Sequence, residues 1–254
     1  MILKDKISNW LKNYLIENNL ESFVIGISGG IDSAVTSTLC AMTGLKTYLV
    51  ILPINQNPNE TNRGIEHCQW LESQFNNIET INLELSNTYS TIKNVVPKIF
   101  HNDLSLANTR ARIRMSILYM IAGGTKGIVV GTGNKVEDFG VGFFTKYGDG
   151  GVDISPIADL MKSDVYKLGE ELKIIDSILR AQPTDGLWDD KRTDEQQLGV
   201  NYDELEWAML NINHKPKNEH EKKIINIYKK HRDKNLHKMK KIPVFKMDYK
   251  NDEL

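Results

Sequence analysis

Apolar residues along this chain form short continuous runs, separated by longer segments in which apolar residues recur every three or four positions. The short runs are rich in β-branched residues and predict buried strands at 23–27, 47–52, 79–83 and 127–131. The periodic segments between them predict helices at 2–15, 32–42, 65–75, 86–98 and 105–122. Strands that alternate with helices favour a parallel sheet covered on both faces, so the predicted class is α/β with an open parallel sheet.

The pattern changes beyond Gly140. Residues 147–151 read as a glycine-rich turn, and periodic segments predict short helices at 163–172 and 176–181. Residues 182–199 are polar and aperiodic, a composition typical of functional or mobile loops. We therefore predict one domain over residues 1–254, with a mobile loop near 182–199 and a basic C-terminal tail that contains a helix.

Charge and cysteine content exclude several protein classes. The chain has 32 Lys and Arg against 33 Asp and Glu, a balance that disfavours nucleic acid as a partner. Cys40 and Cys68 lack the spacing of a metal or redox motif and read as buried thiols of a reducing compartment. The start of the chain does not resemble a secretory signal, and no apolar run is long enough to span a membrane. These features predict a cytoplasmic protein.

The segment Ser28-Gly29-Gly30-Ile31-Asp32-Ser33 lies between a predicted strand and a predicted helix. Free backbone N–H groups and the helix dipole attract an anion at such a turn, and glycine lets the backbone approach it closely. Asp32 cannot face bare phosphate, but it fits a site where Mg²⁺ stands between the carboxylate and the phosphate oxygens. The sequence therefore predicts a phosphate and Mg²⁺ site here.

This loop lacks the lysine of a Walker A motif and the spacing of a dinucleotide-binding motif. It resembles the pyrophosphate-binding loop of the N-type ATP pyrophosphatases, which cut ATP to AMP and pyrophosphate while adenylating a substrate. That resemblance implies a Rossmann-like three-layer fold of the adenine nucleotide alpha hydrolase type. Asp32 and Glu137 would be the ligands of Mg²⁺ if both lie at the carboxyl ends of strands.

The rest of the chain resembles the ammonia-dependent NAD synthetases. The similarity rests on the segments 108–115, 131–134 and 142–153, together with Glu137 and Pro156, and it covers nearly the whole chain. It implies a C–N bond-forming ligase of NAD biosynthesis that amidates deamido-NAD (nicotinate adenine dinucleotide) with ammonia and ATP, through an adenylated intermediate. It also implies a homodimer. The chain is too short to carry this domain and a glutaminase domain, so free ammonia is the expected nitrogen donor.

The resemblance assigns roles residue by residue. Lys162 is assigned to the departing phosphates of ATP, where an ammonium would offset negative charge. The implied ATP contacts are Gly26, Ile27, Ser28, Gly29, Gly30, Ile31, Asp32, Ser33, Thr132, Lys162 and Thr184. The implied deamido-NAD contacts are Arg112, Lys146, Asp153, His237 and Lys238. Arg110 and Arg114 are left as structural formers of ion pairs, because three alternating arginines cannot share one helical face.

One segment departs from the family pattern. Family members read Arg-x-Pro-Tyr-Gly after the second strand, whereas this chain reads Ile51-Leu52-Pro53-Ile54-Asn55-Gln56. The arginine that contacts adenine is missing, and Gln56 is the candidate substitute.

Asp149 is the candidate carboxylate for ammonia, because ammonia is mostly protonated at pH 7 and must lose a proton before it attacks. Asp32, Asp149 and Lys162 thus form the predicted catalytic set. Two alternatives stay open at this point. One is an N-type ATP pyrophosphatase that adenylates another acceptor, such as a tRNA-modifying enzyme. The other is a module that binds ATP without turnover.

Overall fold

The computed structural model describes residues 2–184 and 193–247, and its centre is a four-stranded parallel sheet. The strand order is β3-β2-β1-β4, with β1 (Ser22–Gly26), β2 (Lys46–Ile51), β3 (Ile78–Asn82) and β4 (Gly127–Val129). Val130 extends this edge through a parallel bridge to Ile154. The prediction of four parallel strands in an α/β fold is confirmed, and each predicted strand lies within two residues of an observed one.

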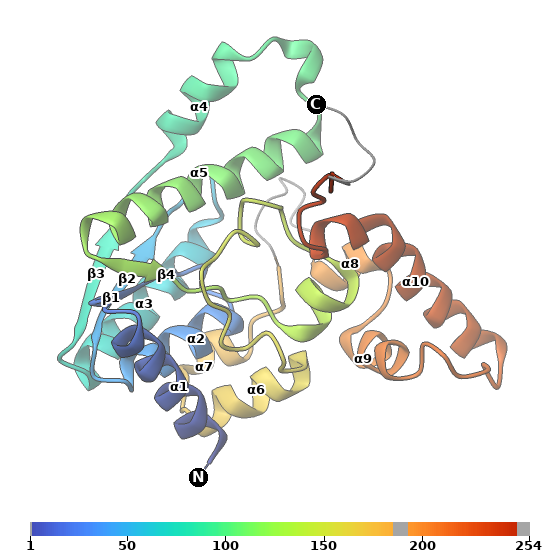
Figure 1. Cartoon of the computed structure of the whole chain (residues 1–254), viewed down its shortest axis with the longest axis horizontal. Coiled ribbons are helices and arrows are strands. Elements are labelled where there is room, and N and C mark those ends of the chain that lie inside the picture. The colour runs from blue at the N-terminus through green and yellow to red at the C-terminus, as the bar shows by residue number, and fades with distance from the viewer. Residues whose placement is uncertain (1, 185–192, 248–254) are drawn as a thin grey trace.

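Side chains that alternate along the buried strands point into two apolar cores, one on each face of the sheet. Phe23 and Ile25 face one core and Val24 faces the other, because successive side chains of a strand point to opposite faces. The first core packs against α1 (Leu3–Glu17), α2 (Ile31–Ala41), α3 (Pro58–Gln74), α6 (Lys162–Glu171) and α7 (Asp176–Leu179). The second packs against α4 (Ser86–Val95) and α5 (Asp103–Gly124). The short helix η1 (Lys98–Phe100) lies between these two helices in the chain. Figure 1 shows these two layers on opposite sides of the sheet.

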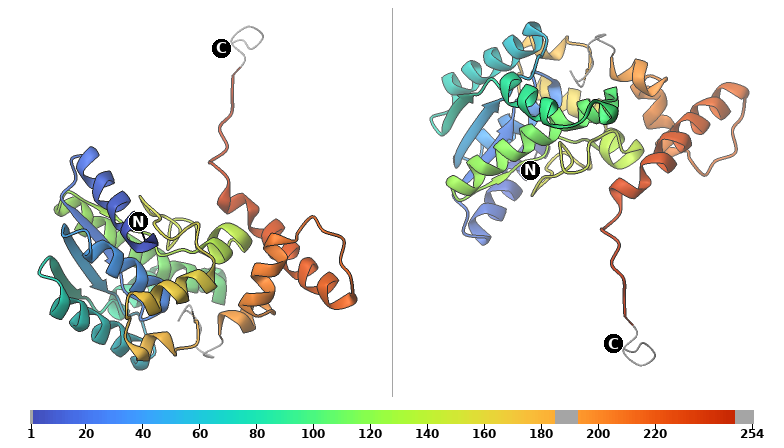
Figure 2. Two further views of the ribbon diagram at one scale, coloured as in Figure 1. Left: turned by 90° about the horizontal axis from the view of Figure 1, so that it is seen from below. Right: turned by 90° about the horizontal axis from the view of Figure 1, so that it is seen from above.

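A third apolar cluster lies beside the sheet and contains no strand of it. It is built from η2 (Lys135–Val141), which is a π-helix, and from α8 (Asp194–Leu198), α9 (Tyr202–Leu210) and α10 (Glu219–Met239). Figure 2 shows α9 and α10 projecting from the body, with the segment after α10 leading away from it. The helix in the basic tail was predicted, whereas η2, α8 and α9 were not. Part of the predicted mobile loop at 182–199 lies outside the described residues, and its last residues form α8.

Candidate functional site

A cavity of about 270 Å³ opens at the carboxyl ends of β1, β2 and β4. This edge of a parallel sheet is where ligands of α/β proteins bind, because the loops that follow the strands converge there. All the residues that the sequence assigned to ATP line this cavity: Gly26, Ile27, Ser28, Gly29, Gly30, Ile31, Asp32, Ser33, Thr132, Lys162 and Thr184. Glu137 and Asp149 line it as well.

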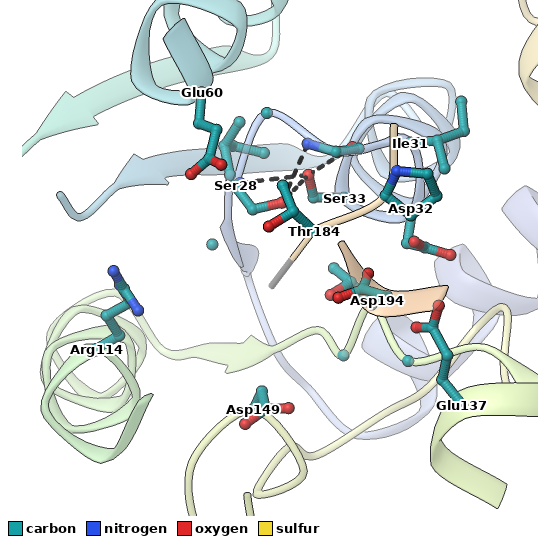
Figure 3. Close-up of a pocket in the computed structure, with 18 of the residues that line it drawn as sticks. Ser28, Ile31, Asp32, Ser33, Glu60, Arg114, Glu137, Asp149, Thr184 and Asp194 are labelled. Atoms are coloured by element: carbon teal, nitrogen blue, oxygen red, sulfur yellow. Dashed lines mark hydrogen bonds between the residues drawn. The ribbon is translucent and has the colours of Figure 1, made fainter. Parts of the chain in front are cut away.

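The loop between β1 and α2 is held by its own two serines. Ser28 and Ser33 pair through their hydroxyls at 3.1 Å, and the Gly30 N–H donates to Ser28 Oγ at 3.2 Å. Ser33 Oγ also donates to the Gly30 carbonyl at 3.0 Å, which ties the loop to the first turn of α2. Figure 3 shows these hydrogen bonds at the N-terminus of α2, where the helix dipole favours an anion.

Gly29 is required by two independent features of this loop. Its φ is +83°, a backbone conformation that glycine adopts without steric cost. A side chain at this position would also collide with the carbonyl oxygen of Glu60, in the first turn of α3. Because α3 packs so closely on the loop, Arg63 reaches back to donate to the Gly29 carbonyl at 3.3 Å.

Two carboxylates converge on one ammonium at the end of the cavity near α6. Lys162 Nζ lies 2.6 Å from Asp32 Oδ2 and 2.9 Å from Glu137 Oε1. The Lys162 side chain is only 3 % exposed. Burial alone would lower the pKa of Lys162, but the charges of Asp32 and Glu137 more than reverse this and hold the pKa above its ordinary value. Lys162 therefore carries its proton at neutral pH and lies between two carboxylates.

Two further residues hold these carboxylates, and neither was predicted from the sequence. Asn134 Nδ2 donates to Asp32 Oδ1 at 3.0 Å, while Asn134 Oδ1 caps η2 by accepting from two of its N–H groups. Tyr202, on α9, donates its hydroxyl to Glu137 Oε1. The N-cap pattern of Asn134 was a usable signal in the sequence. For Tyr202 there was none, because the contact joins residues 65 positions apart.

The side of the cavity near β2 is lined by Arg114 rather than by the arginine that the family pattern supplies. Arg114 donates from Nε to the Leu52 carbonyl at 2.9 Å and from Nη2 to Gln56 Oε1 at 3.1 Å. Gln56 in turn donates to Glu60 Oε2 at 2.9 Å. Gln56 and Arg114 both line the cavity, although Arg114 was predicted to have a structural role only. Ile51, where the family pattern has arginine, is buried in the first core.

Two acidic side chains lie on the glycine-rich side of the cavity. Asp149 accepts the Thr145 N–H at 3.0 Å, which fixes its carboxylate in the turn. Asp138, in η2, also lines the cavity, and burial together with the charges of Asp149, Glu137 and Asp32 raises its pKa well above the ordinary value. Figure 3 shows Asp149 at the side of the cavity away from Asp32 and Glu137.

None of the five residues assigned to deamido-NAD lines this cavity. Arg112 is exposed on α5 and donates to the Lys146 carbonyl at 3.2 Å. Asp153 accepts from Tyr119 Oη at 3.0 Å and from the Val129 N–H at 2.8 Å, so it ties the glycine-rich segment to α5 and β4. His237 is exposed on α10. We call these five residues the acceptor set: Arg112, Lys146, Asp153, His237 and Lys238.

Lys238 belongs to a row of donors on one face of α10. Arg232, Asn235 and Lys238 are spaced three apart, and we call them the α10 ladder. They donate to the backbone carbonyls of residues 139–142 and 144, at distances between 2.5 and 2.9 Å. The ladder holds the end of η2 and the segment that carries Phe143, a residue that lines the cavity.

Comparison with known proteins identifies the family. A family model described as NAD synthase matches residues 3–249. The chain belongs to this family. A curated relative, the NH(3)-dependent NAD(+) synthetase of Alkaliphilus metalliredigens, is 39 % identical over 208 residues, which cover 80 % of this chain and 83 % of that protein.

Two solved structures resemble this fold over nearly the whole chain. The NMN synthetase of Francisella tularensis has a TM-score of 0.87 and 32 % identity, covering 96 % of this chain and 98 % of that one. The NH3-dependent NAD synthetase of Campylobacter jejuni has a TM-score of 0.77 and 23 % identity, with the same coverage, and supports the fold. Within the described residues, no helix is long and apolar enough to cross a membrane.

Proposed function

We propose that this chain amidates deamido-NAD to NAD with ATP and ammonia, releasing AMP and pyrophosphate. The observation that carries the proposal is the convergence of the Ser28–Ser33 loop, Asp32, Glu137 and Lys162 in one cavity. Those groups suit a triphosphate whose terminal part must leave as pyrophosphate. Membership of the NAD synthase family and the name of the Alkaliphilus relative support this reaction. For such an enzyme of NAD biosynthesis we expect a cytoplasmic location.

The nicotinate carboxylate must be activated before ammonia can displace an oxygen from it. We infer that the carboxylate attacks the α-phosphorus of ATP, so that a C–O–P linkage forms while the bond to pyrophosphate breaks. In this proposal the loop N–H groups at the start of α2 and the ammonium of Lys162, which both line the cavity, stabilise the departing pyrophosphate. Adenylation thereby gives the carboxylate a good leaving group, AMP.

The residues present fit one Mg²⁺ ion. Asp32 and Glu137 already converge on a single cation, Lys162 Nζ, so both carboxylates can face one positive charge. No group of three or more His, Cys, Asp or Glu side chains in the described chain could hold a metal by itself. Mg²⁺ commonly takes only one or two carboxylates and completes its shell with phosphate oxygens and water. When bound, the ion would neutralise phosphate charge.

Asp149 is the proposed acceptor of the ammonium proton in the second half-reaction. Its carboxylate lines the cavity and is fixed by the Thr145 N–H, so it would face a cation that enters from the glycine-rich side. Transfer of one proton from ammonium to Asp149 leaves ammonia, whose lone pair attacks the acyl carbon. The C–O bond to AMP then breaks as the amide forms, and the attacking nitrogen loses its second proton to the phosphate of the departing AMP.

A second copy of the chain is the proposed partner. The acceptor set lies outside the cavity of one chain, and large apolar side chains are exposed nearby on α4, η1 and α5. They are Val95, Ile99, Phe100, Leu104 and Met120, with exposed fractions between 55 % and 84 %. A homodimer through this face would cover them. Light scattering during gel filtration should give twice the mass of 28.9 kDa, and Ile99→Glu with Met120→Glu should give a monomer.

A mononucleotide acceptor is the second candidate, favoured by the TM-score of 0.87 to the Francisella NMN synthetase. An NMN synthetase of this reaction class would amidate nicotinate mononucleotide, which has the same reacting carboxylate as deamido-NAD but lacks the AMP half. The choice between the two acceptors is a comparison of kcat/KM values on one enzyme preparation.

The deciding experiment follows pyrophosphate release and amide formation with ATP, Mg²⁺ and each acceptor in turn, with and without ammonium. NAD from deamido-NAD, dependent on ammonium, would support the main proposal. A kcat/KM for nicotinate mononucleotide more than tenfold higher would favour the second candidate. Pyrophosphate release with neither acceptor would contradict both.

A further inference from the structure

Tyr202 contacts both charged partners at the phosphate end of the cavity, through different parts of its side chain. Its hydroxyl donates to Glu137 Oε1, and Lys162 Nζ lies 5.0 Å from the centre of its ring. Tyr202 is only 9 % exposed and begins α9, which belongs to the third apolar cluster rather than to the sheet. One side chain thus connects that cluster to the carboxylate and the ammonium.

The hydroxyl contact fixes which oxygen of Glu137 is occupied. Glu137 Oε1 accepts from both Tyr202 and Lys162. Within the described residues, the structure gives Oε2 of Glu137 no donor, and the residue lines the cavity. Two donors on one oxygen restrict rotation of the carboxylate and leave the other oxygen available to a cation in the cavity.

The ring of Tyr202 contacts Lys162, the cation that would compete with a metal ion for Glu137. Lys162 lies against the face of the Tyr202 ring, where the negative π-face attracts an ammonium. Tyr202 therefore orients the carboxylate of Glu137 and also limits the positions open to Lys162, which donates to that carboxylate. Tyr202→Phe would keep the ring contact with Lys162 and lose the hydrogen bond to Glu137, so the two effects can be separated.

We propose that Tyr202 is a positioning residue that sets the divalent-metal affinity of the site by orienting Glu137. This inference rests on the proposed function, because it assumes that Glu137 faces Mg²⁺ during ATP cleavage. Hydrogen-bond partners of metal ligands commonly change metal affinity about 10- to 100-fold when removed. A purely structural role would instead change stability and leave metal affinity unchanged.

The test measures metal binding rather than turnover. Mn²⁺, whose free concentration is followed by electron paramagnetic resonance, is titrated into the full chain saturated with a non-hydrolysable ATP analogue. Tyr202→Phe is expected to weaken Mn²⁺ binding about tenfold. The matched control is Tyr89→Phe, which removes a buried hydroxyl in the second core, outside the third apolar cluster, and should leave Mn²⁺ affinity unchanged. Urea unfolding of each variant confirms that it is folded.

A double-mutant cycle decides whether Tyr202 acts through Glu137. In the Glu137→Gln background, Tyr202→Phe should cause no further loss of Mn²⁺ affinity. An equal loss in both backgrounds, or an affinity within twofold of wild type for Tyr202→Phe alone, would overturn the proposal. Because no acceptor is present, these outcomes are independent of whether deamido-NAD is amidated. Failure of the proposed function would appear only in the turnover assay.

Discussion

The two ends of the site are built differently. At the proposed phosphate end, residues 26–33, Glu137 and Lys162 line one cavity, and their side chains or backbone groups are fixed by short hydrogen bonds. The acceptor set is spread over α5, the glycine-rich segment and α10, and none of its members lines that cavity. A short motif at the end of a strand can therefore bring the proposed phosphate contacts together, whereas the proposed acceptor contacts come from segments that are distant in the sequence.

The largest effect is expected at the phosphate end from Lys162→Met. Without the ammonium, Asp32 and Glu137 lose the cation that they share, which should cost about 3–5 kcal/mol in the free energy of unfolding. Pyrophosphate release should fall about 10²- to 10³-fold. Urea unfolding with and without Mg²⁺ checks the first effect, and Mg²⁺ should stabilise the variant more than the wild type.

Lys167→Met is the control for that variant, because Lys167 lies on the same helix and is 74 % exposed. It should change neither stability nor pyrophosphate release. An unchanged free energy of unfolding for Lys162→Met would contradict the view that this lysine neutralises the two carboxylates.

Asp149→Asn separates the two half-reactions. Amide formation should slow about 100-fold while pyrophosphate release changes little, because the amide cannot take a proton from ammonium. Rapid-quench measurement of both products gives the two rates. Asp159→Asn, at an exposed carboxylate of the neighbouring loop, is the matched control. Equal losses in both half-reactions would contradict the assignment of Asp149.

Gly29→Ala tests whether the loop between β1 and α2 needs glycine at position 29 to bind ATP. The added methyl group meets the Glu60 carbonyl, and the positive φ is strained for alanine, so ATP should bind about tenfold more weakly. Gly44 has a similar φ of +74° but no atom within 4 Å of a Cβ. Gly44→Ala should therefore lower stability by about 1 kcal/mol and leave ATP affinity unchanged in calorimetric titrations. Equal ATP affinities for the two variants would rule out the crowding argument.

The smallest effect is expected from the α10 ladder. Asn235→Ala removes one donor to the Val141 carbonyl, which should cost about 1 kcal/mol and raise the KM of the acceptor roughly fivefold. The KM of ATP should not change. Asn226→Ala, at an exposed position of the same helix, is the control. A parallel rise in both KM values would mean that the ladder supports the whole site rather than the acceptor end.

The fold was predictable where its signals are local. The runs at 23–27 and 47–52 identified buried strands because both faces of the sheet are covered, and Ser28–Ser33 identified the loop between β1 and α2. Helix α9 could have been found too. Asn201 and Glu204 form a capping box, with mutual side-chain to backbone hydrogen bonds, and that pattern is visible in the sequence.

The rest depends on contacts between distant residues. Nothing near Arg114 shows that its side chain turns to Gln56, 58 residues earlier, and nothing near Tyr202 points to Glu137. The π-helix η2 has only seven residues, too few for a periodic pattern to identify it, and donors on the distant helix α10 satisfy part of its carbonyls. The roles given to the acceptor set by resemblance stay predictions.

The α10 ladder can form only late in the synthesis of the chain. Its donors follow the carbonyls that they hold by 92 to 96 residues. At ordinary rates of synthesis, that separation corresponds to roughly 5 to 20 s on the ribosome. The strands and the loop at the N-terminus of α2 emerge before then, so the nascent protein can assemble its phosphate end while the turn that carries Phe143 still lacks its partners.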